Sequence, residues 1–202
     1  MSDKKKNLHM GQRQVRAIPC ELRARRDDGE ESNPMIEGYF AVFDSTYEIW
    51  DDMSESVAPG AFTKSLKEQK DVRALVNHDT TLVLGRTKAK TLTLKEDEKG
   101  LWGSIQVNPN DRAAMDLYER VLRGDVDGCS FGFDPITEES ETREDGGVHF
   151  TIKECLLWEV SCCTFPAYEE TNIEARSNDR AEMKRRELEA WKKERLAKLK
   201  GE

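Results

Sequence analysis

Short segments in which apolar and polar residues alternate dominate the middle of the chain. Residues 35–43 are rich in β-branched and aromatic residues, 72–76 is a short apolar run, and 91–95 and 100–107 alternate with a period of two. This period is typical of a strand with one buried face. Further strands are expected at 12–25, 82–85, 148–152 and 155–165. Several short strands at this spacing predict an antiparallel, β-rich core.

Two segments carry helical signals instead. Residues 59–69 open with Pro-Gly and place Phe62, Ser65 and Leu66 on one face. A longer helix is expected to start at Asn108 or Asn110, beside Pro109, and to end at a glycine cap, Gly124. Its apolar stripe consists of Ala114, Leu117, Val121 and Leu122. The predicted fold class is therefore α+β, mainly antiparallel strands with a few helices.

The polar pattern at both ends predicts a tail, a domain and a second tail. Residues 1–11 are polar and expected to be disordered, and 12–175 form the domain. Residues 176–202 alternate in charge sign and carry ten basic and six acidic residues. Such a segment is typical of a solvated helix or a partner-binding arm.

Composition narrows the functional classes. The chain has 202 residues, 37% hydrophobic and 36% charged, with a net charge of −8. The acidic balance argues against a general nucleic-acid binder, which needs a basic face. No apolar run approaches the roughly 20 residues that cross a bilayer, and the basic start lacks the apolar stretch of a signal peptide. We expect a soluble, intracellular protein without membrane or nucleic-acid partners.

The five cysteines point to no metal or disulfide chemistry. They are odd in number and form no C-x-x-C pair, so neither a disulfide framework nor a zinc site is predicted. Buried thiols are the simplest interpretation. We expect neither a metal nor a cofactor.

Residues 128–132, GCSFG, fit the G-x-S-x-G pattern of the α/β-hydrolase nucleophile elbow. That elbow needs a strand before the serine and a helix after it. Here the predicted helix comes first and the strand-like Phe131–Phe133 segment follows. Either the match is an accident or Ser130 is a nucleophile on a different fold.

A nucleophilic serine needs a base, and the chain offers three histidines. His9 lies in the N-terminal tail, and His149 follows a Gly-Gly loop at the start of a strand. His78 ends an apolar strand, where a short loop would leave its ring at the rim of the core. A surface or hydrogen-bonded structural histidine is the competing interpretation.

The base in turn needs a group that orients it. Glu159 interrupts an otherwise apolar strand, where a carboxylate costs stability unless it is paired or hydrogen-bonded. An edge-strand charge that faces water is the alternative. Asp79 and Asp134 are rivals, although a residue adjacent to the histidine reaches its ring nitrogen poorly.

The chain resembles the prohead proteases of tailed bacteriophages, which are capsid-maturation serine proteases of the HK97 type. The likeness runs from residue 36 to 173 and rests on motifs that occur in the same order. These are 36–43 (IEGYFAVF), 57–62 (VAPGAF), 75–79 (LVNHD), 84–87 (LGRT), 97–101 (DEKGL), 127–133 (DGCSFGF) and 158–161 (WEVS) with 165–167 (FPA).

The resemblance implies a β-barrel flanked by helices, related to the herpesvirus assembly proteases. It assigns Ser130 as nucleophile, His78 as base and Glu159 as acid of a serine endopeptidase. Arg86, Gly128 and Gly132 become candidates for the oxyanion or substrate site. Cys129 would point to the opposite face and is not expected to be catalytic.

The resemblance also implies partners and a location. The expected substrates are the scaffold segment of the major capsid protein and the protease itself, inside the assembling prohead in the host cytoplasm. A homo-oligomer is expected, and the charged C-terminal arm would direct the enzyme to the shell and be trimmed by self-cleavage. Two other classes remain: a non-catalytic assembly or scaffold protein on a protease-like domain, and an α/β-hydrolase-type esterase, for which only His149 lies downstream of the serine.

Overall fold

We analysed a computed structural model of the chain. The structure describes residues 13–18, 22–25, 34–50, 52–68 and 71–164, together with Arg185, Glu189 and Lys192. The chain divides into two units, Met1–Tyr168 and Glu169–Glu202. The predicted boundaries at 11/12 and 175/176, and the predicted disordered tail, lie outside the described residues and stay predictions.

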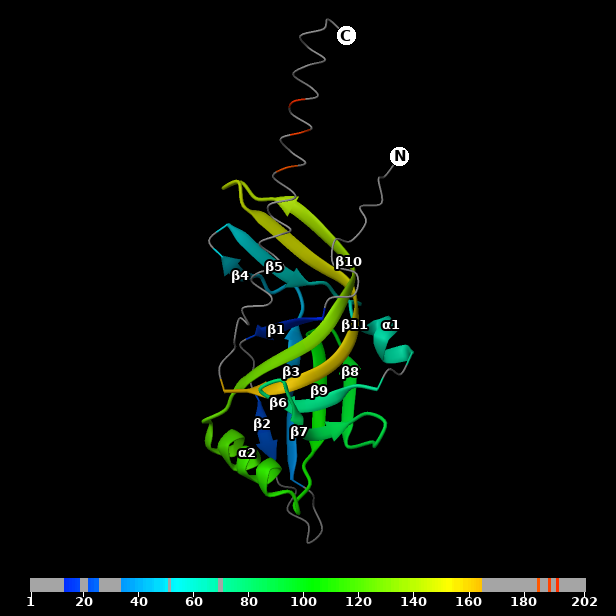
Figure 1. Cartoon of the computed structure of the whole chain (residues 1–202), viewed down its shortest axis with the longest axis vertical. Coiled ribbons are helices and arrows are strands. Elements are labelled where there is room, and N and C mark those ends of the chain that lie inside the picture. Colours follow the sequence, from blue (N-terminus) through cyan, green and yellow to red (C-terminus); the bar gives the residue numbers. More distant parts are fainter. Residues whose placement is uncertain are drawn as a thin grey trace, which may run out of the picture. The chain divides into compact units, whose positions relative to one another are not determined.

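The larger of two β-sheets has seven strands (Figure 1). Its main order is β1-β10-β11-β5-β4, and β6 pairs with both β11 and β7. The strands are β1 (Gln14–Ile18), β4 (Tyr47–Trp50), β5 (Met53–Val57), β6 (Arg73–Val76), β7 (Asp79–Arg86), β10 (Gly128–Thr142) and β11 (Val148–Cys163). Strand β11 runs parallel to β5 and β6, and the other pairs in this sheet are antiparallel.

The second sheet has four antiparallel strands in the order β2-β3-β9-β8. They are β2 (Arg23–Arg25), β3 (Met35–Val42), β8 (Leu92–Glu96) and β9 (Gly100–Gln106). Within the described residues no strand pairing joins the two sheets, so the predicted closed barrel is wrong, and the strands form open sheets. The antiparallel, β-rich α+β prediction is confirmed.

The hairpin of β10 and β11 is the longest strand pair, and it carries both Ser130 and Glu159. Its turn contains Gly146 with a φ of 82°, a conformation that glycine adopts without steric cost. The turn is fixed by Asp145, whose side chain accepts a hydrogen bond from the backbone N–H of Gly147 at 2.9 Å. Although residues 138–142 are mainly polar, β10 extends to Thr142 because its backbone pairs with β11.

Two aromatic rings of β10 pack with Phe62, which directly precedes α1. Phe62 meets Phe131 edge to face with ring centroids 5.3 Å apart, and Phe131 stacks on Phe133 at 5.0 Å. All three side chains are fully buried. These offset and edge contacts add to the apolar burial that holds β10 in place.

The two predicted helices are present, with shifted starts. Helix α1 spans Thr63–Lys67, and α2 spans Arg112–Arg123. The cap of α2 is Asp111 rather than an asparagine, because its side chain accepts hydrogen bonds from the N–H groups of Ala113 and Ala114. Gly124 is the C-cap as predicted, with a φ of 84°. A search of the described residues for a helix that could span a membrane finds none.

Of the predicted C-terminal arm, three residues are described. Arg185, Glu189 and Lys192 are each helical, and Lys192 Nζ lies 2.9 Å from Glu189 Oε1. The rest of the arm lies outside the described residues, so its extent stays a prediction.

Candidate active site

His78 stands on a two-residue turn between β6 and β7. Asn77 and His78 have φ values of 47° and 61°, and the flanking Val76 and Asp79 are paired. Positive φ at both central residues is the geometry of a type I′ hairpin, which favours Asn-Gly. Histidine at the second position adopts a left-handed conformation that costs a non-glycine residue free energy. Strain of this kind is a pointer to function.

The turn is fastened to the end of β11. The backbone N–H of Asn77 donates to the carbonyl of Cys162 at 3.0 Å, and the Asn77 side chain accepts from the N–H of Thr164 at 3.0 Å. These bonds keep the His78 ring beside β11.

The His78 ring is bound by the carboxylate predicted to orient it. Its Nδ1 lies 2.7 Å from Oε1 of Glu159, and the two side chains are 12% and 9% exposed. The backbone N–H of His78 donates to the hydroxyl of Ser161 at 3.2 Å, and that hydroxyl donates to Oε2 of Glu159 at 2.6 Å. Both carboxylate oxygens of Glu159 are thus hydrogen-bonded, which offsets the cost of burying a charge on the strand.

The rival acid Asp79 is engaged elsewhere. Its Oδ1 accepts hydrogen bonds from the Thr81 hydroxyl at 2.6 Å and the Thr81 N–H at 2.8 Å. These bonds from the Thr81 side chain and backbone lower the pKa of the Asp79 carboxyl. Glu159, and not Asp79, is therefore the carboxylate in contact with the imidazole.

The Glu159 carboxylate has room because the residue opposite it in the hairpin is a glycine, which has no side chain. Gly132 is the partner of Glu159 in the β10–β11 register. A Cβ built on Gly132 would overlap Oε1 of Glu159 and lie 3.0 Å from its Cγ and Cδ. The second glycine of the G-x-S-x-G pattern therefore accommodates the carboxylate.

Ser130 lies one strand away from this network. It is the register partner of Ser161, so both side chains project from the same face of the sheet. Its side chain is fully buried, and its hydroxyl donates to the backbone carbonyl of Arg16 at 2.8 Å. Within the described residues no hydrogen bond joins Ser130 to His78. The structure thus brings Glu159 to His78 and places Ser130 about one strand spacing, ~5 Å, from Ser161.

The sequence alone did not single out Ser161 or Cys163. The Cys163 sulfur lies 3.8 Å from Nε2 of His78, the nitrogen that faces away from Glu159. Both residues share a strand face with Glu159, and this period of two was the available signal. Cys129, expected to be non-catalytic, is buried among the apolar core residues.

The remaining candidates have other contacts. The Arg86 guanidinium binds Asp71 at 2.8 and 2.9 Å, and this bond lowers the pKa of the Asp71 carboxyl. Arg86 stands on β7, three strand spacings or roughly 14 Å from β10. A Cβ on Gly128 would lie 2.7 Å from the carbonyl oxygen of Cys163, so this glycine permits close strand packing. Oxyanion or substrate roles for Arg86, Gly128 and Gly132 stay predictions.

His149 takes no part in the candidate site. Its two ring nitrogens lie 2.8 Å from the hydroxyls of Ser54 and Ser56 on β5. A strand rather than a helix continues after Ser130. The esterase alternative, which needed His149 and a nucleophile elbow, is therefore wrong.

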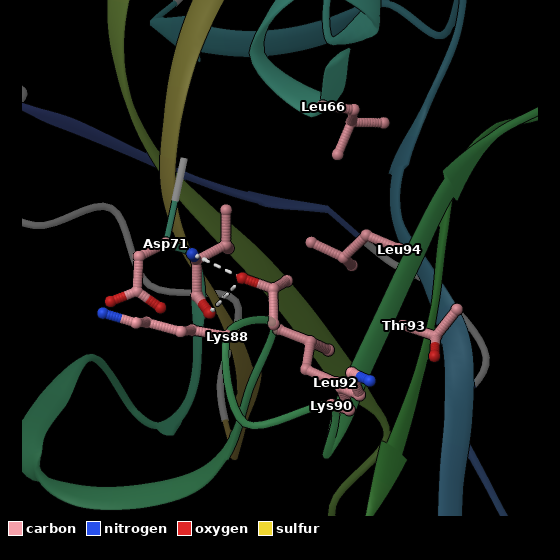
Figure 2. Close-up of a pocket in the computed structure, with 9 residues that line it drawn as sticks. Leu66, Asp71, Lys88, Lys90, Leu92, Thr93 and Leu94 are labelled. Atoms are coloured by element: carbon pink, nitrogen blue, oxygen red, sulfur yellow. Dashed lines mark hydrogen bonds between the residues drawn. The ribbon is translucent and has the colours of Figure 1, made fainter. Parts of the chain in front are cut away.

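A surface hollow of about 630 Å³ lies elsewhere on the molecule (Figure 2). Leu66 and Leu94 line one side of it, and Asp71 and Lys88 lie on the other. None of Ser130, His78 and Glu159 lines it. Within the described residues, no group of three potential metal-ligating side chains occurs.

We predict that His78→Gly is more stable than His78→Ala by about 1 kcal/mol, because only alanine keeps the steric cost of a positive φ. Both variants lack the imidazole, so each is the control for the other. Urea denaturation of both proteins measures the difference. Equal midpoints and slopes would show that the turn is not left-handed in solution.

We also predict that Gly132→Ala destabilises the protein by about 1–3 kcal/mol, because its Cβ collides with the Glu159 side chain. In a Glu159→Ala background that collision is absent and the cost should fall by at least about 1 kcal/mol. A double-mutant cycle by thermal or urea unfolding checks this. Additive effects would contradict the close approach.

Three comparisons with known proteins bear on this site. Residues 20–186, which include Ser130, His78 and Glu159, match the family model described as caudovirus prohead serine protease. The prohead protease of Enterobacteria phage HK97 is 33% identical over 165 residues, which cover 81% of this chain and 69% of that protein. The structure of the bacteriophage T4 capsid assembly protease matches with a TM-score of 0.47 and 12% identity, over 75% of this chain and 99% of that one. The resemblance seen in the sequence is confirmed: the chain belongs to the caudovirus prohead serine protease family.

Proposed function

We propose that this protein is a serine endopeptidase that cleaves the scaffold segment of the major capsid protein, and itself, inside the assembling prohead. Ser130 is the nucleophile, His78 the general base and Glu159 the acid that orients it. One observation carries the assignment: Glu159 binds Nδ1 of His78 at 2.7 Å, on the sheet face from which Ser130 projects one strand away.

The tautomer of His78 follows from this contact. A carboxylate accepts hydrogen bonds, so neutral His78 carries its proton on Nδ1 and leaves Nε2 as the acceptor. The nitrogen available to take a proton is therefore the one that faces away from Glu159. Ser161 supports this arrangement as a positioning residue, since it binds both Glu159 and the His78 backbone.

The reaction we propose is acyl transfer through an ester. As Oγ of Ser130 bonds to the peptide carbonyl carbon, its proton passes to Nε2 of His78. The C–N bond then breaks, and the leaving amine takes that proton. Water hydrolyses the ester by the reverse proton path and regenerates Ser130. Glu159 stays ionised and stabilises the imidazolium that forms in each half-reaction.

Ser130 must turn from the Arg16 carbonyl to serve this chemistry. Catalytic hydrogen bonds are often absent or long in the free enzyme and form when substrate binds. The separation of about one strand spacing between Ser130 and the His78 network is compatible with such a step. Backbone N–H groups are the usual oxyanion donors.

The C-terminal arm has a role in the same proposal. Its ten basic residues against six acidic ones form a locally basic segment on an acidic protein. We propose that it directs the enzyme to the assembling shell and is removed by self-cleavage. Host-cytoplasmic assembly and a homo-oligomeric enzyme belong to this proposal as well.

Co-expression with the major capsid protein of the same virus tests the function. Ser130→Ala and His78→Ala should abolish cleavage, and Glu159→Gln should slow it on the order of 10⁴-fold, because the imidazole loses its orientation and charge stabilisation. Ser140→Ala, the same substitution farther along β10, is the matched control. Gel analysis and intact masses of capsid protein and protease are the measurements.

Uncleaved capsid protein with the wild type, or equal cleavage with Ser130→Ala, would contradict the proposal and favour a non-catalytic assembly protein. Equal intact masses of the wild-type and Ser130→Ala proteases would contradict the proposed self-cleavage of the arm.

A further inference from the structure

Strand β1 covers the outer edge of the strand that carries Ser130. It is the last strand in the sheet order, so β10 would be an open edge without it (Figure 1). The pairing is antiparallel and places Ala17 opposite Ser130 and Arg16 opposite Phe131. An extended peptide that adds to an open edge in this way is a common mode of peptide recognition.

The backbone of β1 contacts the Ser130 hydroxyl where a substrate backbone would lie, but in a geometry that does not allow attack. The Ser130 hydroxyl donates to the carbonyl oxygen of Arg16 at 2.8 Å. Its proton therefore points at the carbonyl oxygen, whereas attack requires the proton to go to a base and the oxygen to approach the carbon. β1 thus places a carbonyl at Ser130 while it holds the hydroxyl in an inactive orientation.

The Arg16 side chain lies on the other face, in a buried acidic subsite. Its guanidinium binds both carboxylate oxygens of Glu55, from Nε and, at 2.8 Å, from Nη2. The two side chains are 5% and 0% exposed. The Tyr47 hydroxyl also donates to Glu55, and the guanidinium stacks over the Phe133 ring at 5.4 Å. A two-point contact of this kind selects a planar basic group by charge and shape.

β1 is an imperfect occupant of this edge. Its Gln14 is 2% exposed, and the side-chain nitrogen has no hydrogen-bond partner among the described residues. A buried donor without a partner weakens the docking of the segment that carries it. A better-matched strand could therefore compete for the same edge.

We propose that β1 is a built-in pseudosubstrate, and that Glu55 makes the site select a basic residue on the amino side of the scissile bond. Arg16 occupies the position of that residue, with its carbonyl at Ser130 and its side chain on Glu55. A substrate strand displaces β1 and places its own arginine there. This rests on the proposed function, since it assumes that Ser130 attacks peptide bonds.

Specificity is tested with the full-length protein and two fluorogenic peptides, one with the sequence of residues 12–18 and one with Arg16→Gln in that sequence. The wild type should cleave the first after arginine with a kcat/KM about 10- to 100-fold higher than the second. Glu55→Gln should reduce this ratio to within about threefold. Glu48→Gln, an exposed carboxylate on the neighbouring β4, is the matched control and should keep the wild-type ratio.

Displacement of β1 is tested with a reversible lock. Ile18 is the register partner of the native Cys129, and paired strand positions lie within disulfide range. Oxidised Ile18→Cys should lose cleavage of both peptides and recover it on reduction, whereas Ile18→Ser and the wild type should not respond.

Four results would overturn the inference: equal wild-type rates for the two peptides, an unchanged ratio in Glu55→Gln, an active locked protein, or no disulfide at all. If Glu55→Gln does not fold, the ratio of kcat/KM for the two peptides measured with the wild type still tests the proposal. Each of these results can occur while the wild type still cleaves capsid protein through Ser130, so a failure here is distinct from a failure of the proposed function.

Discussion

The antiparallel pairing of β10 with β11 is the constraint on which the candidate site depends. It sets Ser130 beside Ser161 and Gly132 beside Glu159, all on one face of the sheet. A slip of one residue would turn Glu159 away from His78 and expose apolar side chains of the core face. The register is held by buried aromatic rings such as Phe131 and Phe133 on the opposite face. The same strand register therefore determines both the packing of the core and the placement of the candidate catalytic residues.

The turn that carries His78, between β6 and β7, is strained and lies beside this hairpin. The left-handed His78 and the buried Glu159 would each cost stability alone, and they are placed so that each offsets part of the other's cost. Ser161 completes the arrangement by binding both. The result is an imidazole held by a carboxylate on Nδ1, the arrangement on which the proposed general-base role of His78 rests.

The periodic signals explain which parts of this were predictable. His78 at the end of an apolar strand and Glu159 inside one are local features, and the structure joins them. No strand was expected where β4 and β5 lie, because Ser54, Glu55 and Ser56 are polar and show no apolar period. They are buried because His149 binds the two serines and Arg16 binds Glu55. Those partners lie about 40 to 95 residues away in the chain, a separation that no local period encodes.

The order of strands in the two sheets could not be predicted from the sequence either, because it depends on pairing between segments far apart in the chain. The closed barrel came from the family resemblance, and the strand pairing shows two open sheets in the described part of the chain. The pairing of β1 with β10 at Ser130 could not be predicted either, because the weak alternation in β1 does not indicate which strand it pairs with. Helix α2 was found to within a few residues because its apolar stripe and Gly124 cap are local.

The nucleophile must be identified directly, because Ser161 Oγ lies 3.3 Å from Nδ1 of His78 and Cys163 Sγ lies 3.8 Å from its Nε2, whereas no hydrogen bond joins Ser130 to His78 within the described residues. A small organophosphorus reagent such as diisopropyl fluorophosphate forms a stable adduct with an activated serine, and tandem mass spectrometry locates the modified residue. We predict a single adduct on Ser130 that is absent in His78→Ala. An adduct on Ser161, or modification of Ser130 that is equally fast without His78, would contradict it.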